Sequence, residues 1–499
     1  MSIKVLPSVP AAVRKEGKLP AGRRIPTGLR AGDSPVPVSG FAQVMAAKRL
    51  KLIAPLAPNS LLGKDFFFRL PCLTLLQLAA LTPPGWEVEL VDEKVDALDL
   101  EAGADLVGIT AMTCNAPRAY AIADAFRRRK IPVVLGGMHP SSLPEEAAAH
   151  ADAVVVGEAE GLWPRVLADF ERGALRPRYR RVGPPPDLRG QPWLDWELFR
   201  DKRYLPVHFI ETTRGCPFDC EFCAVTTAFG GRYRNRPVPE VLAELRQLRP
   251  FEGRFVMKNV VFFVDDNILS NRAHTKALLE GIKGMGLRWL SHASVNLADD
   301  PEILRLCQES GCMGVLIGFE TLAPETMRSI GRKSRLQRDY LDAIQKIHDH
   351  GIGIDGSFVV GFDTDDEGVF DRTLEFVTRA KIEAPYFSIL TPYPGTRLYD
   401  RMEAEGRITS RDWSRYDTSQ VVFRPKTMTP DQLLEGYYRL FRESYRLPNI
   451  LRRLWNASSR KSFFYPMNFG FRSAIGKHHR AHFPGRDGAA PEPAVSSAC

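Results

Sequence analysis

The sequence contains no hydrophobic run long enough to cross a membrane. Its longest apolar stretch, LPCLTLLQLAAL at residues 70–81, is shorter than the roughly 20 residues that a spanning helix needs. The N-terminus also lacks the apolar core of a secretory signal. Residues 1–48 are rich in Pro, Gly, Ala and Arg, which predicts a disordered lead-in and leaves a transit peptide as the less favoured interpretation. We therefore expect a cytoplasmic protein.

Acidic residues are scarce at both ends of the chain. Residues 1–50 hold nine Lys and Arg against two Asp and Glu, and residues 450–499 hold eight against two. Because the net charge of the whole chain is only +9, the remainder is mildly acidic. A nucleic-acid partner would need cations around the body of the protein, so we expect none. The basic C-terminal stretch 459–482 interleaves aromatics with cations, and it either makes a peripheral contact with an anionic inner membrane or packs its Phe residues on the body.

Cysteines are also few and unevenly placed. The chain has eight in 499 residues, which excludes the dense disulfide framework of a small secreted domain. Cys307 and Cys312 fall on and after a predicted helix and are expected to be core thiols. Only Cys216, Cys220 and Cys223 form a tight group, and in an intracellular chain such a group more often binds metal.

The first half of the chain alternates strand-like with helix-like segments. Short strands that are apolar on both faces predict a parallel sheet covered on both sides, here a doubly wound domain at residues 49–175. The predicted strands are 50–55, 87–91, 106–110, 132–135 and 153–156. Ligands of such sheets bind beyond the carboxyl ends of the strands. Those ends carry the segments 55–63, 110–117, 136–144 and 157–161.

A linker is predicted at 176–204, because Pro184, Pro185 and Pro186 cannot continue a helix or a central strand. A second series of six strand–helix units follows at 205–400 and fits a partial (β/α)6 barrel. Its predicted strands are 208–212, 260–264, 288–292, 315–318, 354–361 and 386–390. A helical region at 401–485 and a disordered tail at 486–499 complete the expected α/β architecture.

The cysteine group has a spacing that points to a cluster. The segment RGCPFDCEFC at 214–223 spaces its thiols C-x3-C-x2-C directly after the first barrel strand. Structural zinc normally takes four protein ligands, and no nearby fourth Cys or suitable His is evident. An iron–sulfur cluster with three protein ligands instead leaves one iron open to a substrate or cofactor.

This motif at the end of the first strand of a partial barrel resembles the radical S-adenosylmethionine (SAM) enzymes. The resemblance implies a [4Fe–4S] cluster held by Cys216, Cys220 and Cys223, whose open iron chelates SAM. Reductive cleavage of SAM would then give a 5′-deoxyadenosyl radical. The resemblance also implies SAM contacts at the strand ends: Phe222, Asp265, Asp266, Ser294, Asn296, Glu320 and Gly361.

A doubly wound domain ahead of such a barrel resembles the cobalamin-binding members of this family, among which the hopanoid methylases and tetrapyrrole-modifying enzymes look most similar. Its loops GGMHPSSLPE at 136–145 and VGEAEGLW at 156–163 look like those that cradle cobalamin. The implied cofactor residues are Gly136, Gly137, His139, Gly157 and Glu158.

One loop departs from the cobalamin pattern. Many cobalamin domains carry D-x-H-x-x-G after the first strand, whereas this chain has PLAPNSLLGK at 55–64, without His. In that motif the His ligates the lower face of the cobalt. We therefore expect cobalamin to bind without a His ligand on that face, or the domain to be vestigial. His139 lies on another loop and is expected to shape it.

The resemblance implies an enzyme, a B12-dependent radical SAM C-methyltransferase. We expect it to methylate an unactivated carbon of a small-molecule or lipid substrate, with an isoprenoid lipid or another hydrophobic natural product preferred. Tyr393, on the loop after the last strand, is the candidate catalytic residue, and a flavodoxin or ferredoxin is the expected reductant. The alternatives are a radical cyclase or ring-rearranging enzyme, which would share every motif, and a non-catalytic electron-transfer or sensor protein.

Overall fold

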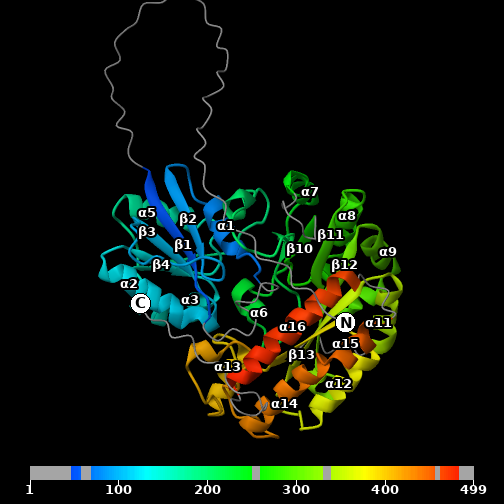
Figure 1. Cartoon of the computed structure of the whole chain (residues 1–499). Helices are drawn as coiled ribbons and strands as arrows, with labels where there is room; N and C mark the ends of the chain where they lie inside the picture. The colour runs from blue at the N-terminus through cyan, green and yellow to red at the C-terminus, as the bar shows by residue number, and fades with distance from the viewer. Residues whose placement is uncertain (1–46, 58–68, 250–258, 330–338, 456–460, 483–499) are drawn as a thin grey trace, which may run out of the picture. The chain divides into compact units, whose positions relative to one another are not determined.

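The computed structural model describes residues 47–57, 69–249, 259–329, 339–455 and 461–482. They form two six-stranded parallel sheets and a set of C-terminal helices (Figure 1). The predicted lead-in and tail, and most of the loop at 55–64, lie outside these residues. No helix among the described residues is long and apolar enough to span a membrane.

The first sheet has the doubly wound topology that the sequence predicts. Its strands, in sheet order, are β2 (Trp86–Asp92), β1 (Lys48–Ala54), β3 (Leu106–Thr110), β4 (Val133–Gly136), β5 (Ala153–Val156) and β6 (Arg178–Arg180). Its helices are α1 (Leu73–Ala80), α2 (Ala116–Arg128), α3 (Met138–Ser142), α4 (Pro144–His150) and α5 (Trp163–Glu171).

The two faces of this sheet bury separate cores because successive side chains of a strand point to opposite sides. In β1, Leu52 packs with Leu75 of α1 and Val166 of α5. The next residue, Ile53, packs on the other face with Ile122 of α2. Every strand therefore needs apolar residues at consecutive positions. Such continuous apolar runs are the pattern from which these strands are predicted.

Strand β6 lies inside the segment predicted to be a linker. It pairs in parallel with β5 and extends the first sheet to its edge. Only Tyr179 is buried, while Arg178 and Arg180 are exposed. An edge strand of three residues with outward cations is stable because pairing uses backbone groups, and such a strand leaves almost no hydrophobic pattern.

The second sheet is the predicted partial barrel. Its strands, in sheet order, are β14 (Ala384–Ile389), β13 (Gly353–Val360), β12 (Cys312–Glu320), β11 (Arg288–Ala293), β10 (Val260–Phe263) and β7 (His208–Ile210). Its helices are α7 (Val238–Gln247), α8 (Arg272–Ile282), α9 (Pro301–Glu309), α10 (Pro324–Ser329), α11 (Tyr340–Asp349), α12 (Val369–Arg379) and α13 (Arg397–Ala404). Cys307 and Cys312 are buried in its core, as expected. Within the described residues β14 and β7 form the two edges and do not pair, so the barrel is open.

Two small elements near the cysteines were not predicted. Strands β8 (Thr213–Arg214) and β9 (Arg234–Asn235) form an antiparallel ribbon, and α6 (Ala224–Phe229) lies between them in the chain. Both elements are shorter than the stretches over which a helical or strand-like hydrophobic period can be recognised in a sequence.

The C-terminal helices pack on the barrel. They are α14 (Pro430–Ser444), α15 (Leu447–Leu454) and α16 (Lys461–His482), drawn orange to red in Figure 1. Phe464 and Phe471 of α16 belong to the barrel core, which confirms the packing interpretation for this part of the basic stretch. Arg453 of α15 is completely buried and donates hydrogen bonds to the carbonyls of Ile382 and Ser444.

We predict that Arg453→Ala destabilises the protein by about 3 kcal/mol, because several buried oxygens lose a charged donor. Arg452→Ala, at an exposed neighbouring position, should change stability by no more than about 0.5 kcal/mol. Thermal denaturation measures both. Equal melting temperatures for the two variants would contradict the role of Arg453.

Candidate active site

The three clustered cysteines lie on the loop that leaves the barrel's first strand. The loop begins after the β8 residue Arg214, and α6 begins immediately after Cys223. Cys220 is buried, Cys216 and Cys223 are half-buried, and none of the three forms a disulfide with another described cysteine. The loop is therefore at the carboxyl edge of the sheet, where barrel active sites occur.

The donor set fits a cluster better than zinc. Structural zinc normally takes four protein ligands, and this loop supplies three thiols. Zinc needs all its ligands within bonding distance of one ion. A [4Fe–4S] cluster spreads its thiolates over separate irons, so three spaced cysteines suit it.

Two adjacent carboxylates hold the start of this loop. Asp265, fully buried after β10, accepts hydrogen bonds from the backbone N–H groups of Thr212 at 2.7 Å and Thr213 at 2.8 Å. Asp266 accepts one from the N–H of Gly215 at 2.8 Å. Burial raises the pKa of Asp265 to about 7, although its hydrogen bonds from Thr212 and Thr213 oppose the rise. Both side chains were predicted to contact SAM; here they fix the backbone that leads into Cys216.

The residues predicted after the third strand form one polar group. Ser294 is buried and hydrogen-bonds the side chains of Asn267 and Asn296. Asn267 follows β10, whereas Ser294 and Asn296 follow β11. The parallel register thus brings side chains from two strand ends together.

Glu320 occupies a strained position at the end of β12. Its φ is 63°, in the left-handed region that non-glycine residues seldom adopt. The pairing of β12 with β13 also shifts register between Gly318 and Glu320. Strain of this kind is often retained at functional sites, which supports the predicted role of Glu320.

The predicted SAM contact Phe222 lies beside the segment that contains Gly361, another predicted SAM contact. The Phe222 ring lies 6.0 Å from that of Phe362 in a T-shaped arrangement. Phe362 follows Gly361, whose φ is 100° and whose missing Cβ would lie 2.8 Å from Leu433. Gly361 therefore has a packing role, and its contact with SAM stays a prediction.

The glycines of the predicted cobalamin loops differ in what they need. A Cβ on Gly137 would meet the Ala111 backbone oxygen at 2.7 Å, whereas a Cβ on Gly157 would meet nothing within 4 Å. Gly136 ends β4, and Gly157 follows β5. Gly157 has a φ of 89°, a backbone conformation that residues with a Cβ seldom adopt. This conformation, and not a lack of space, accounts for the glycine.

The His139 side chain is enclosed by protein and does not face the open space beside Gly157. Its side chain is completely buried, and Nε2 lies 3.2 Å from the Glu146 carboxylate. Trp413 also donates from Nε1 to Glu146, at 2.9 Å, and its ring lies 5.3 Å from that of His139. Burial lowers the pKa of His139. This placement supports the expectation that His139 shapes its loop.

A cavity of about 630 Å³ lies between the two sheets' carboxyl edges. Loops after β3, β4 and β5 form one wall, and α6 with the loop after β14 forms the other. Lining residues include Met112, Ser142, Gly157, Glu158, Ala224, Thr227, Phe229, Tyr393 and Pro394. Burial raises the pKa of Tyr393, so its phenol stays protonated at neutral pH.

Two charged residues were missed by the sequence analysis. Arg214 is 6% exposed and contacts carboxylates of Glu158, Glu160 and Glu211. Arg234 binds Glu158 from the neighbouring strand β9. Burial alone would lower the pKa of Arg214, but the carboxylates of Glu211 and Glu160 outweigh it and the pKa is raised. Arg214 lies two residues before Cys216. This nearness to the cysteine motif is the one feature of the sequence that could have indicated a functional role for Arg214.

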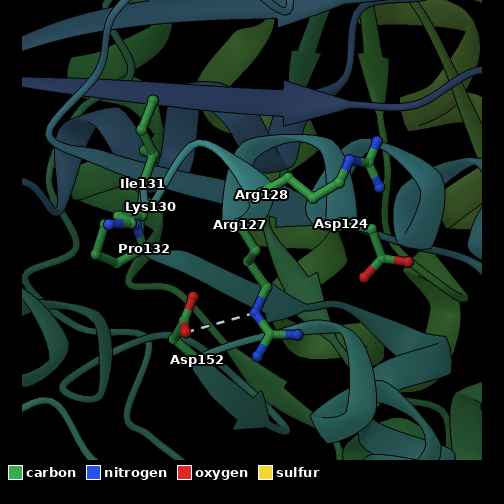
Figure 2. Close-up of a pocket in the computed structure, with 7 residues that line it drawn as sticks. All are labelled: Asp124, Arg127, Arg128, Lys130, Ile131, Pro132 and Asp152. Carbon is green, nitrogen blue, oxygen red and sulfur yellow. Dashed lines mark ion pairs between the residues drawn. The ribbon is translucent and has the colours of Figure 1, made fainter.

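Another hollow, of about 490 Å³, is at the opposite edge of the first sheet (Figure 2). It is lined by residues at the end of α2 and before β4 and β5, and Arg127 pairs there with Asp152 at 3.4 Å. This hollow lies at the amino ends of the strands, whereas the candidate site lies at their carboxyl ends. It therefore does not contribute to the candidate site.

Comparison with known families agrees with this geometry. Residues 64–167 match the B12 binding domain, and residues 210–377 match the Radical SAM superfamily. Residues 396–462 match a domain of unknown function, DUF4070. The fold and site thus define a radical SAM enzyme with a cobalamin-binding domain, which uses a [4Fe–4S] cluster, SAM and cobalamin.

Individual proteins give the narrower assignment. The chain is 34% identical to bacteriochlorophyllide d C-12(1)-methyltransferase of Chlorobaculum tepidum, over 83% of this chain and 91% of that protein. It is 27% identical to hopanoid C-2 methylase of Rhodopseudomonas palustris, over 69% of this chain and 66% of that protein. The methyltransferase TsrM from Kitasatospora setae has the same fold, with a TM-score of 0.63, 17% identity and coverage of 89% of this chain and 100% of TsrM. The protein belongs to the B12-dependent radical SAM methyltransferases.

We predict that Asp265→Ala lowers the iron and sulfide bound after anaerobic reconstitution by several-fold, because two buried N–H groups at the start of the cysteine loop lose their acceptor. Asp365→Ala is the matched control. Asp365 is equally buried and accepts from the N–H groups of Gly361 and Phe362, but at β13. Equal iron loss in both variants would show that Asp265 has only a general structural role.

Proposed function

We propose that this enzyme transfers a methyl group to an unactivated carbon of a hydrophobic substrate, an isoprenoid lipid or another natural product. The supporting observation is the cavity between the cobalamin-domain loops and α6. Such a cavity can hold a substrate close to both cofactor-binding regions, and orientation of this kind supplies much of an enzyme's rate enhancement.

When bound, the cluster would supply the electron that cleaves SAM, and cobalamin would carry the methyl group. Cys216, Cys220 and Cys223 would hold the cluster, and Asp265 and Asp266 keep their loop in place. Phe222 and Phe362 would form an apolar wall for the adenine. Tyr393 would orient the substrate as a hydrogen-bond donor, since its phenol stays neutral. Glu320, Ser294, Asn296 and Gly361 would complete the SAM site.

The choice of substrate class rests on the relatives and on the cavity lining. The relatives are named for a bacteriochlorophyllide and a hopanoid. Apolar groups of Met112, Met138, Val156 and Phe229 lie on the cavity wall. These observations favour a hydrophobic molecule. We propose a flavodoxin or ferredoxin as the reducing partner.

We predict that the reconstituted enzyme, given CD3-labelled SAM, a low-potential reductant and a total lipid and pigment extract, forms 5′-deoxyadenosine and a product that carries one CD3 group in place of hydrogen. Mass spectrometry detects both. The triple variant Cys216→Ala, Cys220→Ala, Cys223→Ala is the control and should form neither, because it cannot hold the cluster.

A different product would identify the alternative activity. Formation of 5′-deoxyadenosine together with an isomer or a dehydrogenated product, and with no CD3 incorporated, would contradict methyl transfer and favour a radical cyclase. A wild-type enzyme that forms no 5′-deoxyadenosine would contradict radical catalysis itself.

We also propose that the C-terminal helices contact an anionic membrane surface. Leu447 and Leu451 of α15 are 45% and 48% exposed, and Trp455, directly after the helix, is 67% exposed. Their spacing of four residues places them on one face. Residues 444–486 contain nine Lys and Arg, of which Arg453 is buried, and no Asp or Glu. Exposed apolar anchors among cations are typical of peripheral membrane contacts.

We predict that wild-type protein co-sediments with vesicles that contain phosphatidylglycerol, and much less with pure phosphatidylcholine. Leu451→Ser with Trp455→Ser should reduce this binding several-fold, since two apolar anchors are removed. Leu198→Ser changes an exposed leucine elsewhere and is the control. Unchanged binding in the double variant would contradict the proposed surface. Deleting α16 is unsuitable as a test because Phe464 and Phe471 belong to the barrel core.

A further inference from the structure

We propose that Glu158 is a positioning residue, which holds the cobalamin-binding loop against the cluster-binding loop through ion pairs with Arg214 and Arg234. The inference deepens the proposed function and rests on it. Glu158 is one of the residues that the family resemblance implies as cobalamin contacts. In the structure both oxygens of its carboxylate are bound by arginines of the barrel.

The contacts are short and shielded from solvent. Glu158 Oε2 lies 2.5 Å from Arg214 Nη1 and 2.9 Å from Arg234 Nη1, and Oε1 lies 2.9 Å from Arg234 Nη2. The side chains of Glu158, Arg214 and Arg234 are 8%, 6% and 14% exposed. Salt screens buried pairs of this kind far less than surface pairs, and the two-point fork from Arg234 also fixes the orientation of the carboxylate.

The ribbon β8–β9 explains why two arginines meet one glutamate. Arg214 and Arg234 are direct partners across this antiparallel pair, so their side chains lie on the same face. Two cations in this arrangement repel each other. Glu158, supplied by the other sheet's loop, lies between them and removes the repulsion. The cobalamin domain therefore supplies part of the negative charge that offsets the two paired arginines.

Further carboxylates complete the group. Arg214 also binds Glu211 at 2.7 Å, from the end of β7, and Glu160 at 2.7 Å, from the same loop as Glu158. Arg234 also donates to the carbonyl of Pro186 at 2.8 Å. Two of the three carboxylates thus come from the cobalamin domain, while both arginines come from the barrel.

Each end of this group leads directly to a cofactor-binding segment. Glu158 follows Gly157, whose open side faces the cavity. Arg214 precedes the loop with Cys216, and Gly215 between them is held by Asp266. A displacement of Glu158 from Arg214 would therefore change the separation of the two cofactor sites. Misplacement by about 1 Å can cost about 100-fold in rate, so this distance matters for methyl transfer more than for SAM cleavage, which takes place at the cluster alone.

The test compares Glu158→Gln with Asp169→Asn in the reconstituted holoenzyme. Asp169 of α5 is also a buried carboxylate bound by two arginines, Arg172 and Arg176, but both belong to its own domain. Pulsed EPR measures the dipolar coupling between cob(II)alamin and the reduced cluster. Bound iron and cobalamin are measured in parallel, together with the ratio of 5′-deoxyadenosine formed to methyl groups transferred.

We expect Glu158→Gln to keep both cofactors, to broaden the distance distribution between them and to raise this ratio about tenfold, a fraction of the loss that a full misplacement can cause. Asp169→Asn should leave the coupling and the ratio unchanged. Arg234→Gln should reproduce the effect of Glu158→Gln, and the double variant should be no worse than either one, because all three disrupt one interaction.

An unchanged distance distribution in both Glu158→Gln and Arg234→Gln would overturn the proposal. If Glu158→Gln fails to retain cobalamin, Arg234→Gln decides, since Arg234 belongs to the barrel. The EPR measurement does not depend on substrate turnover. An enzyme that transfers no methyl group would refute the proposed function while the coupling still tests the role of Glu158.

Discussion

Parallel pairing throughout both sheets is the constraint on which the rest of this structure depends. In a parallel sheet every strand delivers its following loop to the same edge, so residues far apart in sequence meet there without any direct attraction. Asp265 after β10 and Thr212 after β7 lie 53 positions apart, yet they share a hydrogen bond. The same rule places Gly137 and Gly157 at one edge of the first sheet. Each sheet needs continuous burial on both faces to exist, and the apolar strands provide it.

The strands could be predicted because each leaves a local signal, and the cysteine spacing is a local signal of the same kind for the predicted cluster ligands. Continuous apolar runs such as 153–156 give a strand without reference to anything distant, and the cysteine spacing carries its own chemistry. Strand β6 and the ribbon β8–β9 could not be predicted, since their stability comes from backbone pairing with partners elsewhere. Two or three residues of mixed polarity have no period to detect.

The roles of individual polar residues were harder to predict than their positions. The resemblance implied that Glu158, Asp265 and Asp266 contact cofactors, and the structure places all three after strands at the carboxyl edges. The sequence does not reveal which polar group will hydrogen-bond or pair with a given carboxylate. Asp265 binds backbone N–H groups, and Glu158 binds guanidinium groups. Buried carboxylates need such partners, and here the partners come from segments that sequence periodicity does not connect.

The pairing of Glu158 and Glu160 with Arg214 and Arg234 has a consequence for the modularity of this architecture. A sheet domain and a barrel that are joined by apolar contact can be exchanged between relatives with modest repacking. Here the cobalamin domain supplies two of the three carboxylates and the barrel supplies both arginines of a water-poor junction, so a chimera that keeps only one side would bury charges that have lost partners. A chimera of two relatives should therefore fold when all four positions come from the same parent. The ion pairs at this junction thus restrict which cobalamin domain can be combined with which barrel.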